Sequence, residues 1–160
     1  MKTSGILKSL LTGAIALAIA VPLLAEVKIV LTASKIVVVN GAEQKQASDK
    51  ARPGETIEYV AEYKNTGKDK VSDVMANLPV PAGMEFLPQT AAPEGATATT
   101  DDKTWSPIPL KRSVRGADGK MKDTLVPFSE YKSLRWNLGE IAGGSSKSVK
   151  ARMKVKETRQ

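Results

Sequence analysis

The chain has 160 residues, contains neither cysteine nor histidine, and carries a formal net charge of +7. The missing residue types exclude disulfide bonds, Ser-His-Asp and Cys-His catalysis, and the usual zinc ligand sets. The charge is moderately basic and is not typical of a dedicated nucleic-acid binder.

Residues 1–25 have the features of a secretory signal peptide. Lys2 and Lys8 form a basic start, an apolar run extends from Ile6 to Val21, and Ala25 ends a plausible cleavage site. The alternative is a membrane anchor, although the run is shorter than the ~20 apolar residues that a spanning helix needs. We expect cleavage after Ala25 and export through the general secretory route, which leaves residues 26–160 as one domain, extracellular, on the cell surface or periplasmic.

The segment from Val27 to Val39 is apolar and extended. Val27, Ile29, Leu31 and Ala33 point to one side, and residues 36–39 then form a continuous apolar run, a pattern that predicts a β-strand. This strand is longer than the usual five or six residues. Either it kinks near residues 32–34 and crosses from one sheet to the other, or part of it projects beyond the fold. Asn40-Gly41 then predicts a tight hairpin.

The central part of the sequence reads as two strands between turns. Pro53-Gly54 marks a turn, and residues 56–64 alternate between apolar and polar side chains. Asn65-Thr66-Gly67 predicts a reversal in which Asn and Gly adopt a left-handed backbone. A second alternating strand follows and stops at Pro79, because proline has no N–H for a β-ladder.

The remaining elements predict more short strands between turns. Tyr131 is placed at a corner where its hydroxyl can bind backbone, and residues 145–155 form a closing strand with one apolar and one cationic face. About seven strands with regular turns predict an all-β, immunoglobulin-like antiparallel sandwich. The expected core anchors are Tyr59, Trp105, Trp136 and Leu138.

The order of these signals resembles a secreted immunoglobulin-like repeat module, domain-of-unknown-function family eleven. The matching motifs are Pro53-Gly54-Glu55, Asn65-Thr66-Gly67 and Pro81-Ala82-Gly83, with Leu134 to Leu138 and the last strand in corresponding places. The resemblance covers most of residues 26–160 and involves turn chemistry. It implies a fold and an exported location, and it implies no ligand.

Basic residues suggest a surface for acidic polymers. Such a surface could bind acidic polysaccharide, lipopolysaccharide or extracellular DNA. The alternative is that lysines on an exposed strand prevent edge-to-edge aggregation. The candidate residues are Lys150, Arg152, Lys154 and Lys156 on the last strand, with Arg112 and Arg115 in a basic hairpin that also contains Lys111, Lys120 and Lys122.

Three further constellations carry weaker signals. Glu58 and Glu62 share one strand face and could form an acid pair, but such faces are normally solvated. Asp101-Asp102 lacks the pattern of a calcium loop. An isopeptide bond would need Lys28 or Lys35 to meet Asn137 around a buried acid. We therefore expect no metal, no cofactor and no small-molecule substrate.

Two functional hypotheses remain, and an enzyme is disfavoured. The first is a structural module of the bacterial envelope or exterior that self-assembles head to tail, inserting Val27, Ile29 and Leu31 at the sheet edge of a neighbouring subunit. A contact of this kind builds a filament unless its rotation closes. The second is a monomeric module that binds polyanions through its basic strand face.

Overall fold

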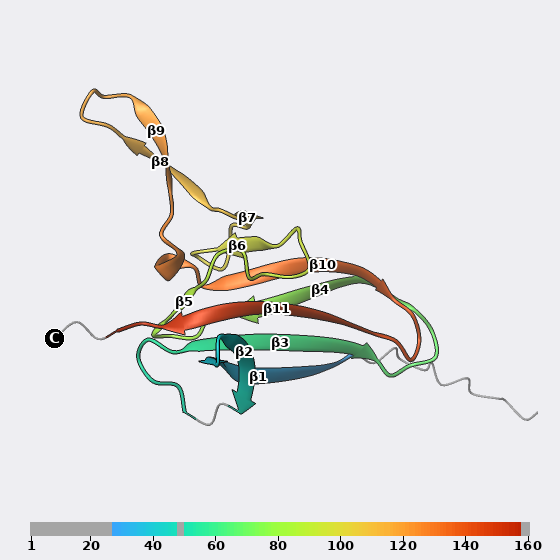
Figure 1. Cartoon of the computed structure of the whole chain (residues 1–160). Helices are drawn as coiled ribbons and strands as arrows, with labels where there is room; N and C mark the ends of the chain where they lie inside the picture. The colour runs from blue at the N-terminus through green and yellow to red at the C-terminus, as the bar shows by residue number, and fades with distance from the viewer. Residues whose placement is uncertain (1–26, 48–49, 158–160) are drawn as a thin grey trace, which may run out of the picture.

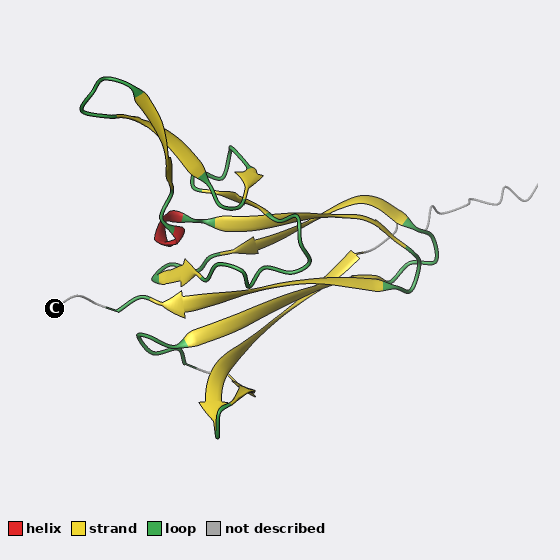
Figure 2. Cartoon of the chain, turned by 45° about the horizontal axis from the view of Figure 1, so that its top comes forward, coloured by secondary structure: helices red, strands yellow, loops and turns green. Residues whose placement is uncertain are grey.

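The computed structural model describes residues 27–47 and 50–157, so the predicted signal peptide lies outside the described part of the chain. The described residues form eleven strands and one short 3₁₀ helix, η1 (Phe128–Glu130). Two antiparallel sheets face each other, and a separate hairpin extends from them (Figures 1 and 2). The all-β sandwich is confirmed, with eleven strands in place of about seven. Three of the eleven are only two or three residues long, and two of these lie where Met84 to Leu87 and Ala96 to Thr100 predict short strands.

The first sheet contains the long strands that begin and end the described chain. Its strand order is β2-β1-β3-β11-β5. The members are β1 (Val27–Val39), β2 (Ala42–Ala47), β3 (Thr56–Asn65), β5 (Met84–Phe86) and β11 (Ser146–Val155).

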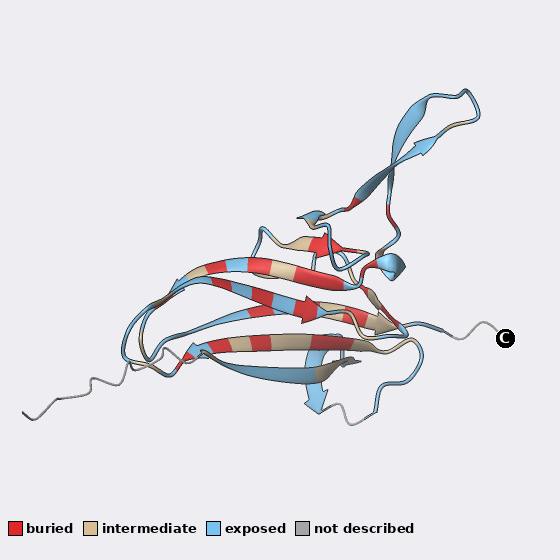
Figure 3. Ribbon diagram, turned by 180° about the vertical axis from the view of Figure 1, so that it is seen from behind, coloured by how far each residue is buried: buried red, intermediate tan, exposed pale blue. Residues whose placement is uncertain are grey.

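The second sheet is smaller and has the order β4-β10-β6-β7. The two remaining strands, β8 and β9, pair only with each other, and their fully exposed hairpin points away from the sandwich (Figures 1 and 3). The bounds are β4 (Val71–Pro79), β6 (Thr97–Thr99), β7 (Ser106–Pro107), β8 (Lys111–Arg115), β9 (Met121–Leu125) and β10 (Ser133–Ile141).

The core lies between the sheets and is built by alternate residues of the long strands (Figure 3). Trp136 and Leu138 on β10 are buried, and the Trp136 indole N–H donates to the Pro93 carbonyl at 2.8 Å. Tyr59 is half-buried and packs against this core. Tyr131 is buried, and its hydroxyl accepts the Leu110 backbone N–H at 2.7 Å, the corner contact that its position predicts.

Trp105 lies outside the core cluster, contrary to expectation. It immediately precedes β7, a two-residue strand at the margin of the second sheet, and it contacts Arg135, which alternates on β10 with the buried residues Leu134 and Trp136 and so faces away from the core. The Arg135 guanidinium instead stacks 3.6 Å from the centroid of its ring. Trp105 therefore contributes a surface cation–π contact and not a core anchor.

The long strand β1 stays within the first sheet and does not cross to the second. Its residues Val27 to Ile36 pair with β3, and Ser34 to Val39 pair with β2. The last three residues extend beyond β3 and are held by β2 alone, while the strand curves along its length (Figure 2). The predicted crossing to the second sheet does not occur, and the part that extends past β3 stays within the fold because β2 pairs with it.

The Asn65 turn works differently from the prediction. Asn40 and Gly41 have positive φ, as a two-residue hairpin requires, but Asn65 and Gly67 do not. Asn65 is instead fully buried, and its side-chain amide donates to the carbonyls of Asp69 and Ile141. Its Oδ1 accepts the Gly67 N–H, so the side chain rather than the backbone conformation organises this reversal.

Substitution of Trp136 by alanine tests the core. We expect Trp136→Ala to lower the free energy of unfolding by about 3–5 kcal/mol, because it removes a buried aromatic side chain and leaves a cavity. The matched control, Trp105→Ala, removes a partly exposed ring and should cost about 1 kcal/mol. Urea denaturation followed by circular dichroism measures both. Equal losses for the two variants would contradict the assignment of the core.

Candidate functional site: an open strand edge beside a buried ion cluster

The first half of β1 forms an open edge of the first sheet. From Val27 to Ala33 this strand pairs with β3 on one side, and β2 joins the other side only from Ser34 onward. No described residue pairs with the other side of residues 27–33. We call residues 27–33 the β1 edge.

The β1 edge exposes apolar side chains on both of its faces. Ile29 and Leu31 are 57% and 54% exposed, and Val30 on the opposite face is 41% exposed. Ile29 lies opposite Tyr63 in the ladder with β3, and Leu31 lies opposite Ala61, so both share the inner face with core residues. They remain exposed because the edge strand of the second sheet, β4, makes its main contacts with the first sheet at β3 and β11.

The ladder shows which backbone groups of this edge face outward. The backbone N–H and C=O of Lys150 bond to Ala92, on the side of β11 away from β3. Because these groups alternate in direction along a strand, the odd-numbered residues of β11 direct theirs toward β3. In that register the odd residue Ala151 lies opposite Tyr59, and β3 therefore turns its even-numbered residues toward β1. The even residues of β1 face β3 in turn. The groups left facing outward belong to Val27, Ile29, Leu31 and Ala33.

The other edges of the two main sheets are protected in ways that the β1 edge is not. The strands β5 and β7 have three and two residues, and β7 ends in Pro107. The strand β2 carries only polar and alanine residues. The strand β11 pairs with β5 only over its last three residues, and its first residues are polar, with the sequence Ser-Lys-Ser. There the Lys147 ammonium donates to the Leu138 carbonyl of the second sheet at 2.7 Å.

The edge of β4 is closed by a tyrosine. The Tyr63 hydroxyl accepts the Asn77 N–H at 3.0 Å and donates to the Asn77 carbonyl at 3.2 Å. One side chain from the first sheet thus occupies both backbone groups that an added strand would need at this position. No comparable side chain caps the β1 edge among the described residues.

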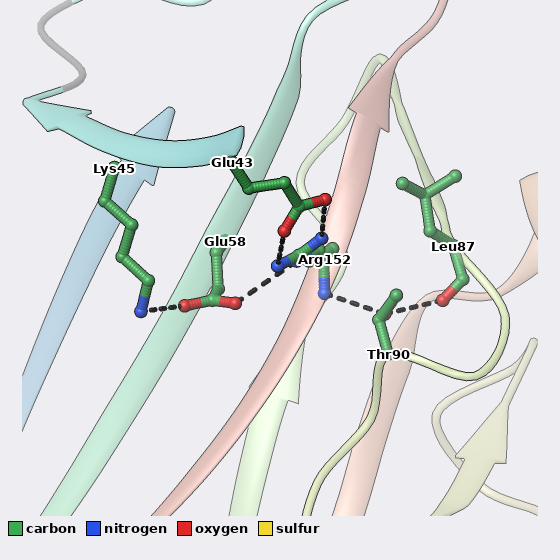
Figure 4. A network of polar contacts seen from close by, with 6 residues as sticks. All are labelled: Glu43, Lys45, Glu58, Leu87, Thr90 and Arg152. Atoms are coloured by element: carbon green, nitrogen blue, oxygen red, sulfur yellow. Dashed lines mark hydrogen bonds and ion pairs between the residues drawn. The ribbon is translucent and has the colours of Figure 1, made fainter. Parts of the chain in front are cut away.

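A buried ion cluster holds β2 over the outer face of the first sheet (Figure 4). Glu58 on β3 is only 4% exposed, contrary to the expectation of a solvated face. Its carboxylate pairs with the Lys45 ammonium at 2.5 Å and accepts from Arg152 Nε at 3.2 Å. The Arg152 guanidinium also forms a two-bond fork with Glu43 at 2.8 and 2.9 Å. Two residues of β2, Glu43 and Lys45, are thereby fixed to β3 and β11.

These contacts keep Glu58 ionised despite its burial. Desolvation alone would raise the pKa of Glu58, but the interactions with Lys45 and Arg152 outweigh it and hold the pKa below its ordinary value of 4.5. The fork with Arg152 likewise lowers the pKa of Glu43. Glu58 pairs with two cations, and Glu43 pairs with the Arg152 guanidinium through two bonds, so both carboxylates serve as structural anions. Glu62 takes no part in the cluster, so the predicted acid pair of Glu58 and Glu62 is not formed.

The predicted polyanion-binding residues do not form one surface. Arg152 is neutralised by Glu43 and Glu58, and Arg112 pairs with Glu130. Lys156 donates to the Ser129 carbonyl, while Lys150 is exposed and Lys154 half-buried. Arg115 is exposed on the β8–β9 hairpin, which stands apart from β11 (Figure 1).

The weaker candidates are also accounted for by local contacts. Asp101 Oδ1 accepts the backbone N–H groups of Thr104 and Lys103 and the Thr99 hydroxyl, which together hold the pKa of Asp101 well below its usual range. Lys35 pairs with Glu55, and Asn137 accepts the Gly139 N–H in the other sheet, so the isopeptide constellation is not assembled. Within residues 27–47 and 50–157, no acidic cluster of metal-binding size occurs.

Comparisons with known proteins add no relative. No protein-family model matches the chain, and neither the curated proteins nor the solved structures contain a match. The resemblance to domain-of-unknown-function family eleven therefore stays a prediction. In the described part of the chain, no helix has the length and hydropathy needed to cross a membrane.

The ion cluster predicts a pH-dependent stability. Because folding lowers the pKa of Glu58, its contribution is present above about pH 4.5 and is lost as the pH falls through the folded-state pKa. We expect Glu58→Gln to lower the free energy of unfolding by about 1–3 kcal/mol at pH 7. The difference from the unmodified protein should shrink as the pH falls below 4.5.

Urea denaturation at several pH values measures this effect. The matched control is Glu62→Gln, which changes the other glutamate on the outer face of β3, outside the cluster. A loss for Glu58→Gln that is the same at all pH values would show that burial of the side chain, not its charge, matters.

Proposed function

We propose that this protein is a non-catalytic structural module that assembles by β-strand addition at its β1 edge. The observation that carries the proposal is the seven-residue open edge with apolar side chains on both faces. Extended edges of this kind accept an added strand, whose main-chain hydrogen bonds supply affinity and whose alternating side chains supply register. The absence of histidine and cysteine supports a role without catalysis.

The apolar side chains provide a driving force for the assembly. Complete burial of an aliphatic side chain is worth roughly 1.5–3 kcal/mol. Ile29 and Leu31 are already about half-buried, so each offers roughly half of that amount. This gain is modest relative to the entropy lost on association. The backbone hydrogen bonds along the edge must therefore contribute, and we expect a concentration-dependent assembly.

Addition to β1 fits the chain better than donation of β1. Donation would require β1 to break its pairing with β3 over Val27–Ile36 and to drag along β2, which the ion cluster anchors. Addition leaves these contacts intact. The setting that we propose is the bacterial envelope or exterior, because residues 1–25 have the features of an export signal.

Binding of acidic polymers remains the alternative, with less support. Two of its arginines, Arg112 and Arg152, are engaged with carboxylates, and the remaining cations are divided between β11 and the β8–β9 hairpin. A dispersed set of charges gives a weaker local potential than one continuous patch.

The double substitution Ile29→Lys with Leu31→Lys tests the proposed function. Both side chains are about half-buried, so we expect the free energy of unfolding to fall by roughly 1–3 kcal/mol while the fold is retained. Assembly should be lost, because the lysines place charge where an added strand would bury apolar groups. Sedimentation velocity over a concentration series measures the mass.

The matched control is Val38→Lys, which changes an apolar residue of the same strand that is 70% exposed but lies where β2 already covers the edge. This variant should assemble like the unmodified protein. A protein that stays monomeric throughout the series and is retained on heparin in a salt-dependent manner would favour the polyanion alternative.

A further inference from the structure

The β1 edge has a sequence that can pair with itself. Its seven residues, Val27 to Ala33, have Val30 at their midpoint. When two such edges run antiparallel about a twofold axis at Val30, Ile29 of each lies opposite Leu31 of the other, and Val27 lies opposite Ala33. Every residue on the inner face then meets an apolar residue.

The backbone groups fit the same register. An antiparallel ladder alternates pairs that exchange hydrogen bonds with pairs that do not. The outward-facing groups belong to the odd-numbered residues, and the pairing about Val30 places odd residues opposite odd residues. The pair on the axis, Val30 with its symmetry mate, is a pair without hydrogen bonds, where side chains come closest. No residue must shift and no bulge is needed.

The charges are also compatible with this register. Lys28 is the only ionisable residue of the β1 edge, and it faces Thr32 of the other copy. The two Lys28 side chains lie at opposite ends of the paired segment, separated along the strand by four residues or roughly 13 Å. That separation exceeds the screening length of ~8 Å at physiological ionic strength, so their repulsion is small.

We propose that two copies of this protein pair through their β1 edges about a twofold axis at Val30 and join their first sheets into one continuous sheet. This inference rests on the proposed function and specifies its partner and its register. Ile29 and Leu31 of both copies form one apolar cluster on the inner face, at the flank that the second sheet leaves uncovered. The contact is isologous, since each copy uses the same surface.

Single cysteines test the register, because the chain has none of its own. A cysteine at position 30 meets its own symmetry mate across a pair with Cα atoms about 4.5 Å apart, within the range that a disulfide spans. With dissolved oxygen as the oxidant, we expect Val30→Cys to form disulfide-linked dimers about tenfold faster than Val38→Cys, an exposed site on the same strand, because pairing raises the effective thiol concentration.

Two offset variants define the axis. Lys28→Cys and Thr32→Cys should each crosslink slowly alone, because identical positions are separated by about four residues along the strand. Mixed together they should form the heterodimer rapidly, because each faces the other across the axis. The full-length protein is used, with mass measured by sedimentation in parallel and thiol accessibility measured by alkylation.

The outcomes separate this inference from the proposed function. If the protein assembles but Val30→Cys does not crosslink preferentially, the twofold register is wrong while strand addition stands. If the protein is monomeric and Val30→Cys is freely alkylated, both are wrong. If it is monomeric and Val30→Cys resists alkylation, another segment of the same chain covers the edge, which also overturns the dimer.

Discussion

The buried carboxylate of Glu58 is the constraint on which the outer face of the first sheet depends. Removing a carboxylate from water is costly unless cations and hydrogen bonds replace the solvent. Here Lys45 arrives from β2 and Arg152 from β11, and Glu43 completes the arrangement by holding the other side of the guanidinium. Since β2 and β11 are separated by two strands in the sheet order, both can reach Glu58 only if the β1–β2 hairpin folds back over the sheet.

This constraint divides β1 into two parts with different exposure. Beyond Ser34 the strand is joined to β2 through the Asn40-Gly41 hairpin and is anchored by the ion cluster. Before Ser34 the strand pairs with β3 alone among the described residues, and no described strand lies on its other side. The contrast with β4 is informative, because Tyr63 occupies both backbone groups of Asn77 there. A chain that protects its other long edge with a buried tyrosine and leaves β1 apolar and uncapped has the physical features of a surface used for pairing.

Period-two alternation predicted much of the fold, because each long strand of the core buries alternate residues. The start of β3 at Thr56, the end of β4 at Pro79, the Asn40-Gly41 turn and the buried positions of β11 follow from local pattern. The burial of Glu58 does not, because it depends on cations supplied from positions 45 and 152. Trp105 was misplaced for the same kind of reason: its size indicates a core residue, but its contact is with Arg135, which faces away from the core. The cations of β11 and the β8–β9 hairpin were grouped by charge, and only the three-dimensional arrangement separates them.

The geometry of the β1 edge also bears on how far an assembly can grow. A head-to-tail contact uses two different surfaces and leaves each new subunit with a free acceptor, so it propagates. A twofold contact centred on Val30 consumes the same edge of both copies and leaves neither available. Further growth would then need a second edge, and the remaining ones in the described sandwich are short, polar, or closed by Tyr63 and Lys147. Because β1 provides the one open apolar edge among the described strands, the twofold pairing that we propose would give a closed pair, whereas the same segment, read from the sequence alone, suggested polymerisation.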